Sequence, residues 1–236
     1  MMNGHKFDFP SDVINIFVLI YDYSGSMDCH ENAIIEANKA FYSDFSRFEE
    51  KNSVAISKVC FTEHVTMSPF GPVSNFDTCY YANGGTRLYR AIIHAGEETI
   101  EYYTQLMKRL GIRARITFLV FTDGEDNENR PEEIEAAKKM ITQLNSLEAT
   151  TVFIAFDQAI EAKDGEKLGF TCTRDISTAE ELISCLGIEL SQSCKEQSRS
   201  AVSLQSKFFS KVATTQQDDS DTPGEDDMLG DNFFDV

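Results

Sequence analysis

Continuous apolar runs mark the strands of a buried sheet. Residues 13–21, 116–122 and 151–156 consist mainly of Val, Ile, Leu and Phe, and they lack the strict apolar–polar alternation of a strand with one wet face. Runs of this kind are typical of parallel strands that are buried on both faces. Two shorter runs, 54–61 and 65–70, predict a hairpin at the edge of the same sheet.

Segments with helical spacing separate these strands. Apolar positions three and four residues apart predict helices over residues 31–48 and 88–110, and Pro131 stands where the first turn of another helix tolerates proline. A short strand is expected near residues 170–172, and a capping-box pattern that begins at Thr178 predicts a final helix. The alternation predicts an α/β fold, a doubly wound and mostly parallel sheet with helices on both faces.

The composition divides the chain into four parts. We expect an N-terminal extension over residues 1–9, one domain over 10–195, a polar linker over 196–212 and an acidic tail over 213–236. The tail has eight Asp or Glu residues and no Lys or Arg, so it cannot bury enough apolar surface to order itself and should be disordered. Near its end, Phe233 and Phe234 suggest either a short docking peptide for a partner or a purely solubilising tail. The sequence leaves both alternatives open.

Charge and hydropathy exclude several classes of function. The net charge of −18 argues against direct binding of nucleic acid, which needs clustered Lys and Arg. No apolar stretch approaches the roughly 18 residues of a membrane span, and the start of the chain shows no secretory signal pattern. The six cysteines lack zinc-like spacing and are interpreted as reduced thiols. We therefore expect a cytoplasmic protein that contacts no membrane.

Oxygen-bearing side chains follow two of the buried strands. Asp22, Ser24 and Ser26 come directly after the first apolar run, Thr86 ends a turn that contains two glycines, and Asp123 follows the run 116–122. Open α/β sheets bind ligands at the carboxyl ends of their strands, and hard divalent cations take oxygen ligands. Each motif alone also occurs in ordinary turns and helix caps, so it is their combination that indicates a metal site.

This combination resembles the metal-dependent adhesion site of the von Willebrand factor A family. Its five positions are filled by the expected residue types, and the resemblance implies that Asp22, Ser24, Ser26, Thr86 and Asp123 bind Mg²⁺, or Mn²⁺ or Ca²⁺, directly or through water. It further implies that an Asp or Glu from a protein partner completes the metal coordination. Nearby acids at positions 28, 125, 126 and 128 are expected to be solvated loop charges, or alternatively to select basic residues around the partner's acidic anchor. Tyr23 is expected to pack beside the site.

The resemblance implies a non-enzymatic function. We expect a metal-dependent protein–protein interaction module in an intracellular multiprotein assembly, similar to small proteins of bacterial stress and defence systems. An alternative is a phosphatase that resembles the haloacid dehalogenases, with Asp22 as nucleophile. In that family a second aspartate two residues later is the general acid, whereas this chain has Ser24 there. A third reading is an α/β scaffold whose site binds nothing.

Overall fold

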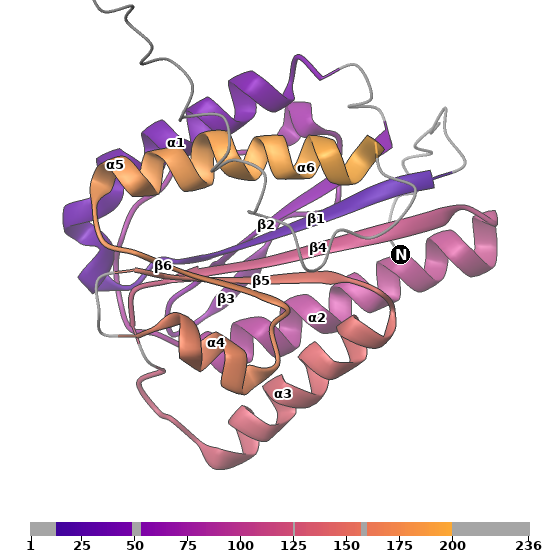
Figure 1. Ribbon diagram of the computed structural model, residues 1–236. Helices are drawn as coiled ribbons and strands as arrows, with labels where there is room; N and C mark the ends of the chain where they lie inside the picture. Colours follow the sequence, from indigo (N-terminus) through magenta and orange to yellow (C-terminus); the bar gives the residue numbers. More distant parts are fainter. Residues whose placement is uncertain (1–12, 49–52, 125, 157–159, 200–236) are drawn as a thin grey trace, which may run out of the picture.

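The computed structural model describes residues 13–48, 53–124, 126–156 and 160–199 (Figure 1). Within them lies one sheet of six strands in the order β3-β2-β1-β4-β5-β6. Every neighbouring pair is parallel except β2 and β3, which are antiparallel. The strands are β1 (Val13–Asp22), β2 (Val54–Phe61), β3 (Val65–Met67), β4 (Arg113–Thr122), β5 (Thr150–Phe156) and β6 (Cys172–Ile176).

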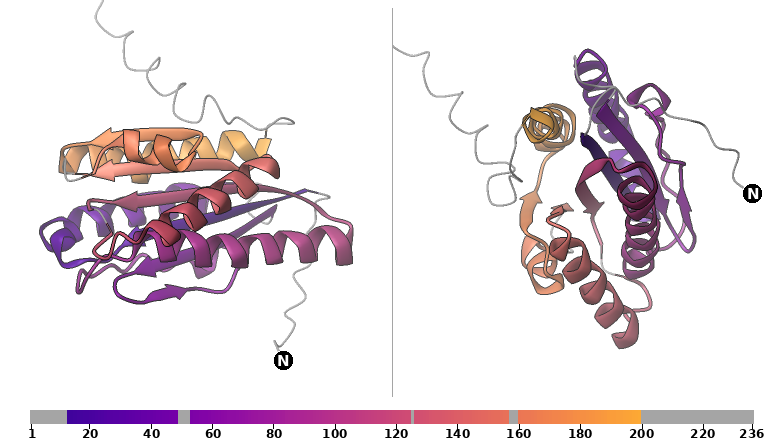
Figure 2. Two further views of the ribbon diagram at one scale, coloured as in Figure 1. Left: turned by 90° about the horizontal axis from the view of Figure 1, so that it is seen from below. Right: turned by 90° about the vertical axis from the view of Figure 1, so that its right-hand side faces the viewer.

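Helices cover both faces of this sheet, as predicted (Figures 1 and 2). One layer has α1 (Glu31–Phe45), α5 (Ala179–Leu182) and α6 (Leu190–Arg199), and the other has α2 (Leu88–Gln105), α3 (Pro131–Ser146) and α4 (Ala162–Leu168). Short 3₁₀ helices span Gly25–His30 and Val73–Asn75. π-helical turns extend α2 over Leu106–Leu110 and join α5 to α6 over Ile183–Glu189.

The central strand β1 connects the two hydrophobic cores. Phe17, Leu19 and Tyr21 pack in the core under α1, while Val18 and Ile20 pack in the core under α2 and α3. All five side chains are at most 1% exposed, because successive residues of a strand point to opposite faces and both faces are covered. Burial on both faces therefore explains why residues 13–21 are continuously apolar.

Most predicted elements are confirmed, and several boundaries differ. The edge hairpin forms, with β3 shorter than the predicted 65–70, and Pro131 is at the start of α3. The predicted helix over 31–48 ends at Phe45. The last strand is Cys172–Ile176 rather than 170–172, because Phe170 instead packs against Phe153 in the core, with ring centroids 5.2 Å apart.

Several predicted parts of the chain are described only in part or not at all. Helix α6 continues to Arg199, which lies within the predicted linker 196–212. The predicted N-terminal extension 1–9, the acidic tail 213–236 and the pair Phe233 and Phe234 lie outside the described residues. Among the described residues, no helix is both long enough and apolar enough to cross a membrane.

Candidate metal centre

The candidate site lies where two central strands end side by side. β1 and β4 are parallel neighbours, Asp22 is the last residue of β1, and Asp123 follows the last residue of β4. The strand order runs outward in opposite directions from this pair, to β2 on one side and β5 on the other. Such a switch point leaves a crevice at the carboxyl ends of the strands, where open α/β sheets bind ligands.

A continuous run of hydrogen bonds joins three of the predicted residues. The hydroxyls of Ser24 and Ser26 are 3.0 Å apart, and the Ser26 hydroxyl donates to Asp123 Oδ1 at 3.0 Å. The Asp22 carboxylate is fixed beside them, because Oδ1 accepts the Ser24 backbone N–H at 2.8 Å and Oδ2 accepts the Thr122 hydroxyl at 2.6 Å. Residues from two separate loops therefore form one cluster.

Backbone bonds place Thr86 between these two loops. On one side, the Gly25 N–H donates to the Gly84 carbonyl at 2.9 Å. On the other side, the Asn127 N–H donates to the Thr86 carbonyl at 2.9 Å, and the Thr86 N–H donates to Asn127 Oδ1 at 2.5 Å. Gly84 has a φ of +101°, and a Cβ there would meet the Glu63 carboxylate, so this turn requires glycine.

Burial makes the cluster electrostatically costly without a cation. Asp22 is fully buried and Asp123 is 5% exposed, whereas Ser26 is exposed to solvent. Burial, with a smaller contribution from the nearby Asp123 charge, raises the pKa of Asp22 from 3.8 to about 6, although hydrogen bonds from Thr122 and Ser24 oppose the rise. A divalent cation among these oxygens would offset both charges.

The donor set fits a hard cation. It consists of carboxylate and hydroxyl oxygens, which Mg²⁺, Mn²⁺ and Ca²⁺ accept as ligands. In the described part of the chain, no group of three or more His, Cys, Asp or Glu side chains could hold a metal ion. A metal ion at this position would therefore need hydroxyl oxygens in addition to the two carboxylates.

Several residues that support the site could not be inferred from the motif. The Tyr80 hydroxyl donates to the Asp22 carbonyl, and the Tyr23 hydroxyl donates to the Cys79 carbonyl at 3.0 Å. Lys58 is 5% exposed, and its ammonium donates to the carbonyls of Asp77 (at 3.0 Å) and Cys79. These bonds hold the segment that leads to Thr86. The one sequence signal was a lysine inside the apolar run 54–61.

One of the acids near the rim, Asp126, differs from the prediction. Asp126 is only 3% exposed, and its carboxylate accepts the N–H of Tyr89 at 3.2 Å and of Glu128 at 3.0 Å, so it caps the start of α2. Glu128 forms ion pairs with Arg87 and Arg130. These two acids therefore connect the loop after β4 to α2. Asp28 is exposed as expected, and residue 125 lies outside the described ranges.

Comparison with known sequences gives no assignment. No protein-family model matches the chain, and no curated protein matches it either.

Comparison with solved structures identifies the fold. The pilus adhesin SpaC from Lactobacillus rhamnosus GG, in an open conformation, matches with a TM-score of 0.60 and 13% identity over 80% of this chain and 30% of the adhesin. A mutant of the PilB minor pilin from Streptococcus sanguinis matches with a TM-score of 0.56 and 11% identity over 80% of this chain and 64% of the pilin.

A third similar structure is proximal thread matrix protein 1 from the mussel byssus, in a form whose MIDAS motif, a metal-dependent adhesion site, is occupied by zinc. Its TM-score is 0.52, with 12% identity over 77% of this chain and 46% of the mussel protein. This chain spans less than two thirds of each of the three similar chains. At these identities the similarity shows the fold alone. The described domain has the mostly parallel α/β fold that the sequence predicted, and it shares this fold with the three similar structures.

Proposed function

We propose that this chain is a metal-dependent protein-binding module. Asp22, Ser24, Ser26, Thr86 and Asp123 would together hold one divalent cation, Mg²⁺ or alternatively Mn²⁺ or Ca²⁺. The observation that carries the proposal is the hydrogen-bonded run from Ser24 through Ser26 to Asp123, beside the buried Asp22 carboxylate at the switch point of the sheet. The zinc-occupied motif of the structurally similar mussel protein supports a divalent ion.

The low charge of this shell explains why it would bind a protein. Three of the five ligands are neutral hydroxyls, which only partly satisfy a doubly charged ion. An open coordination position then remains attractive to an external carboxylate. We propose that an Asp or Glu of the partner fills this position, so that binding depends on both the metal and the acidic residue.

We further propose that the site binds without catalysing a reaction. A phosphatase of the haloacid dehalogenase type would need a carboxylic acid two residues after Asp22. Ser24 stands there, and its hydroxyl is engaged by Ser26. A hydroxyl with an ordinary acidity is a poor proton donor near neutral pH, which favours the binding function.

Calorimetric titration with MgCl₂ and MnCl₂ tests the metal site. We expect Asp123→Ala to weaken binding at least tenfold, about 1.4 kcal/mol, because it removes one of the two charged ligands. A cooperative thermal transition should show that the metal-free variant is folded, since Asp123 follows β4 and lies outside both hydrophobic cores. The matched control is Asp28→Ala, an exposed acid on the same side that should leave affinity unchanged. Equal affinity of wild type and Asp123→Ala would contradict the assignment.

The setting proposed for the module is an intracellular multiprotein assembly, as in bacterial stress and defence systems. Affinity purification compares the intact protein, the Asp22→Ala variant and the intact protein in EDTA. A partner that depends on the metal should be recovered with the intact protein and lost in the other two experiments. The same experiment with residues 231–236 deleted tests whether Phe233 and Phe234 dock on a partner. Recovery of every partner at unchanged strength after this deletion would assign the tail a solubilising role only.

A further inference from the structure

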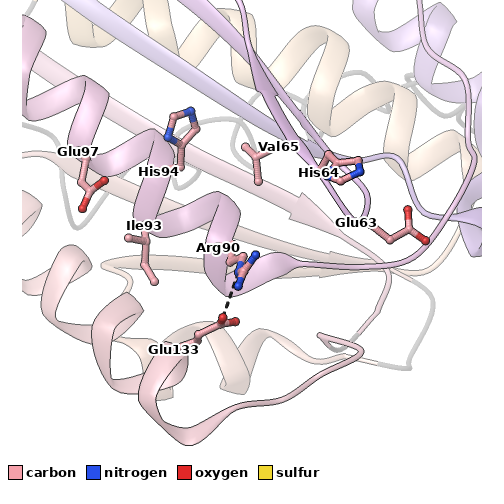
Figure 3. Close-up of a pocket in the computed structure, with 8 residues that line it drawn as sticks. All are labelled: Glu63, His64, Val65, Arg90, Ile93, His94, Glu97 and Glu133. Carbon is pink, nitrogen blue, oxygen red and sulfur yellow. Dashed lines mark hydrogen bonds and ion pairs between the residues drawn. The ribbon is translucent and has the colours of Figure 1, made fainter.

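A groove opens beside the candidate metal centre, between β3 and α2 (Figure 3). Its volume is about 410 Å³. Val65 and Ile93 supply apolar surface, and charged or ionisable side chains surround them. The complete lining is Glu63, His64, Val65, Arg90, Ile93, His94, Glu97 and Glu133. The function proposed above uses none of these residues.

One wall of the groove is an open strand edge. In the described ranges the sheet ends at β3, which pairs with β2 on one side only. The Thr62 N–H donates to the His64 carbonyl, and the Ser68 N–H donates to the Lys58 carbonyl. Hydrogen-bonded and non-hydrogen-bonded pairs alternate along an antiparallel ladder, so Val65 and Met67 belong to pairs that are not hydrogen-bonded to β2. Their N–H and C=O groups point away from β2, where a further strand could bind them.

The groove is physically continuous with the metal centre. Glu63, in the turn before β3, accepts the Gly85 N–H at 2.7 Å. Gly85 directly precedes the proposed ligand Thr86. An extended segment that leaves the metal centre on this side therefore reaches Glu63 first and the edge of β3 next.

Two of the three carboxylates in the groove, those of Glu63 and Glu97, are free of ion pairs with the described residues. Arg90 is occupied by Glu133, with Nε 3.0 Å from Oε1, and Glu133 also pairs with Arg87. Glu63 and Glu97 are exposed at opposite ends of the groove, as Figure 3 shows, and neither forms an ion pair with a described residue. Hydrogen bonds from its own backbone N–H and from Gly85 lower the pKa of Glu63, so it stays ionised.

We propose that this groove binds an extended segment of the partner that adds to the edge of β3 and carries a Lys or Arg side chain between Glu63 and Glu97. The inference rests on the proposed function, because the same segment supplies the acidic residue to the metal. It specifies the partner sequence as an acidic anchor with a basic residue at a fixed offset. The apolar floor of Val65 and Ile93 suits the methylene stem of a long basic side chain.

A peptide library tests this specificity. The library has one fixed Asp and random residues on both sides, and it is selected on the full chain in MgCl₂. We expect Lys or Arg to be enriched at one offset from the Asp. Affinity for a selected peptide should fall about 2- to 5-fold in Glu97→Gln, the range of an exposed ion pair. Glu98→Gln, an exposed acid on the same helix outside the groove, is the matched control and should change nothing.

Two further variants separate charge from strand pairing. Glu97→Lys should weaken binding more than Glu97→Gln, and a peptide with Glu in place of the selected Lys or Arg should restore it. N-methylation at alternate peptide residues should weaken binding at least tenfold in one register and little in the other, because a strand on an edge uses alternate N–H groups. Thermal unfolding of each protein variant confirms that it is folded.

The outcomes distinguish this inference from the proposed function. Selected peptides that need Mg²⁺ but show no basic preference, or that bind wild type and Glu97→Lys equally well, overturn the groove inference and leave the metal-dependent module in place. Equal effects of N-methylation in both registers overturn the strand pairing. A library that yields no Mg²⁺-dependent peptide overturns the proposed function, and the groove inference with it.

Discussion

At the residue scale, Asp22 couples pH to stability. Its pKa is raised from 3.8 to about 6 in the folded protein, chiefly by burial. Below pH 3.8 the group is protonated in both the folded and the unfolded chain, so it costs the fold nothing. As pH rises through 6, the folded state holds the proton longer than the unfolded state does, and stability is lost. The loss by pH 7 is about 3 kcal/mol, at 1.36 kcal/mol for each pKa unit.

We therefore predict that Asp22→Asn stabilises the metal-free protein at pH 7 and not at pH 4. Asn keeps an acceptor for the Ser24 N–H and removes the buried charge. Urea unfolding in EDTA should show the free-energy difference between variant and wild type growing by about 2.5 kcal/mol between pH 4 and 7. Saturating MgCl₂ should shrink the pH dependence of the wild type. A difference that does not vary with pH would mean that Asp22 titrates normally.

At the element scale, Lys58 of β2 anchors the long connection between β3 and α2. Its ammonium donates to the carbonyls of Asp77 and Cys79, and it lies 5.4 Å from the ring centroid of Tyr21 and 5.6 Å from that of Tyr23. This connection also delivers Thr86 to the metal centre. We therefore infer that this buried cation on a strand positions the proposed ligand Thr86 on a loop.

We predict that Lys58→Met reduces both stability and metal affinity. Met retains most of the apolar stem but removes the Lys58 donor from the Asp77 and Cys79 carbonyls, of which Cys79 keeps the Tyr23 hydroxyl. The loss of hydrogen bonds from a charged group should cost about 1.5–3 kcal/mol. The loosened connection should also weaken Mg²⁺ binding, measured by calorimetry at a temperature where the variant is fully folded. Lys39→Met, at an exposed position of α1, is the control. Reduced stability with unchanged metal affinity would make Lys58 a structural residue without a positioning role.

The sequence predicted the elements that bury a clear apolar run or an apolar face. β1, β4 and β5 were visible because both faces are covered, and the edge hairpin was visible from its short apolar runs. Helix α4 was not predicted, because only Gly165 and Leu168 of its residues are buried, too few to form an apolar stripe. β6 was misplaced because its residues are mostly polar, and its pairing with β5 is a tertiary effect.

The residues of the candidate site likewise fall into those that the sequence predicted and those that it did not. Its five proposed ligands were predicted from short motifs in three segments of the chain, and the structure joins Ser24, Ser26 and Asp123 directly. The roles of Lys58, Tyr80 and Asp126 depend on contacts between segments far apart in the chain, which no local pattern records. Asp126 in particular was expected in solvent and is instead the cap of α2.

At the scale of the whole molecule, the charge is strongly unbalanced. A net charge of −18 acts against compaction, because the folded state brings like charges closer together than the unfolded state does. It also favours the approach of cations and of basic segments to the acidic groove and metal centre. The same excess charge thus opposes folding and assists the binding proposed here.

We predict that salt stabilises the metal-free chain. Raising NaCl from 0.05 to 0.5 M shortens the screening length severalfold, roughly from 14 to 4 Å, and should weaken the repulsion by about 1 kcal/mol. For a domain of this size that corresponds to a rise in Tm of about 2–4 °C. Thermal unfolding in EDTA measures the shift.

The same protein without residues 213–236 loses eight acids and no bases, so its Tm should rise less. KCl should give the same result as NaCl, because screening depends on ionic strength and not on the identity of a monovalent cation. If Tm stays constant with salt, or responds equally with and without residues 213–236, the long-range repulsion among these charges is too small to affect folding.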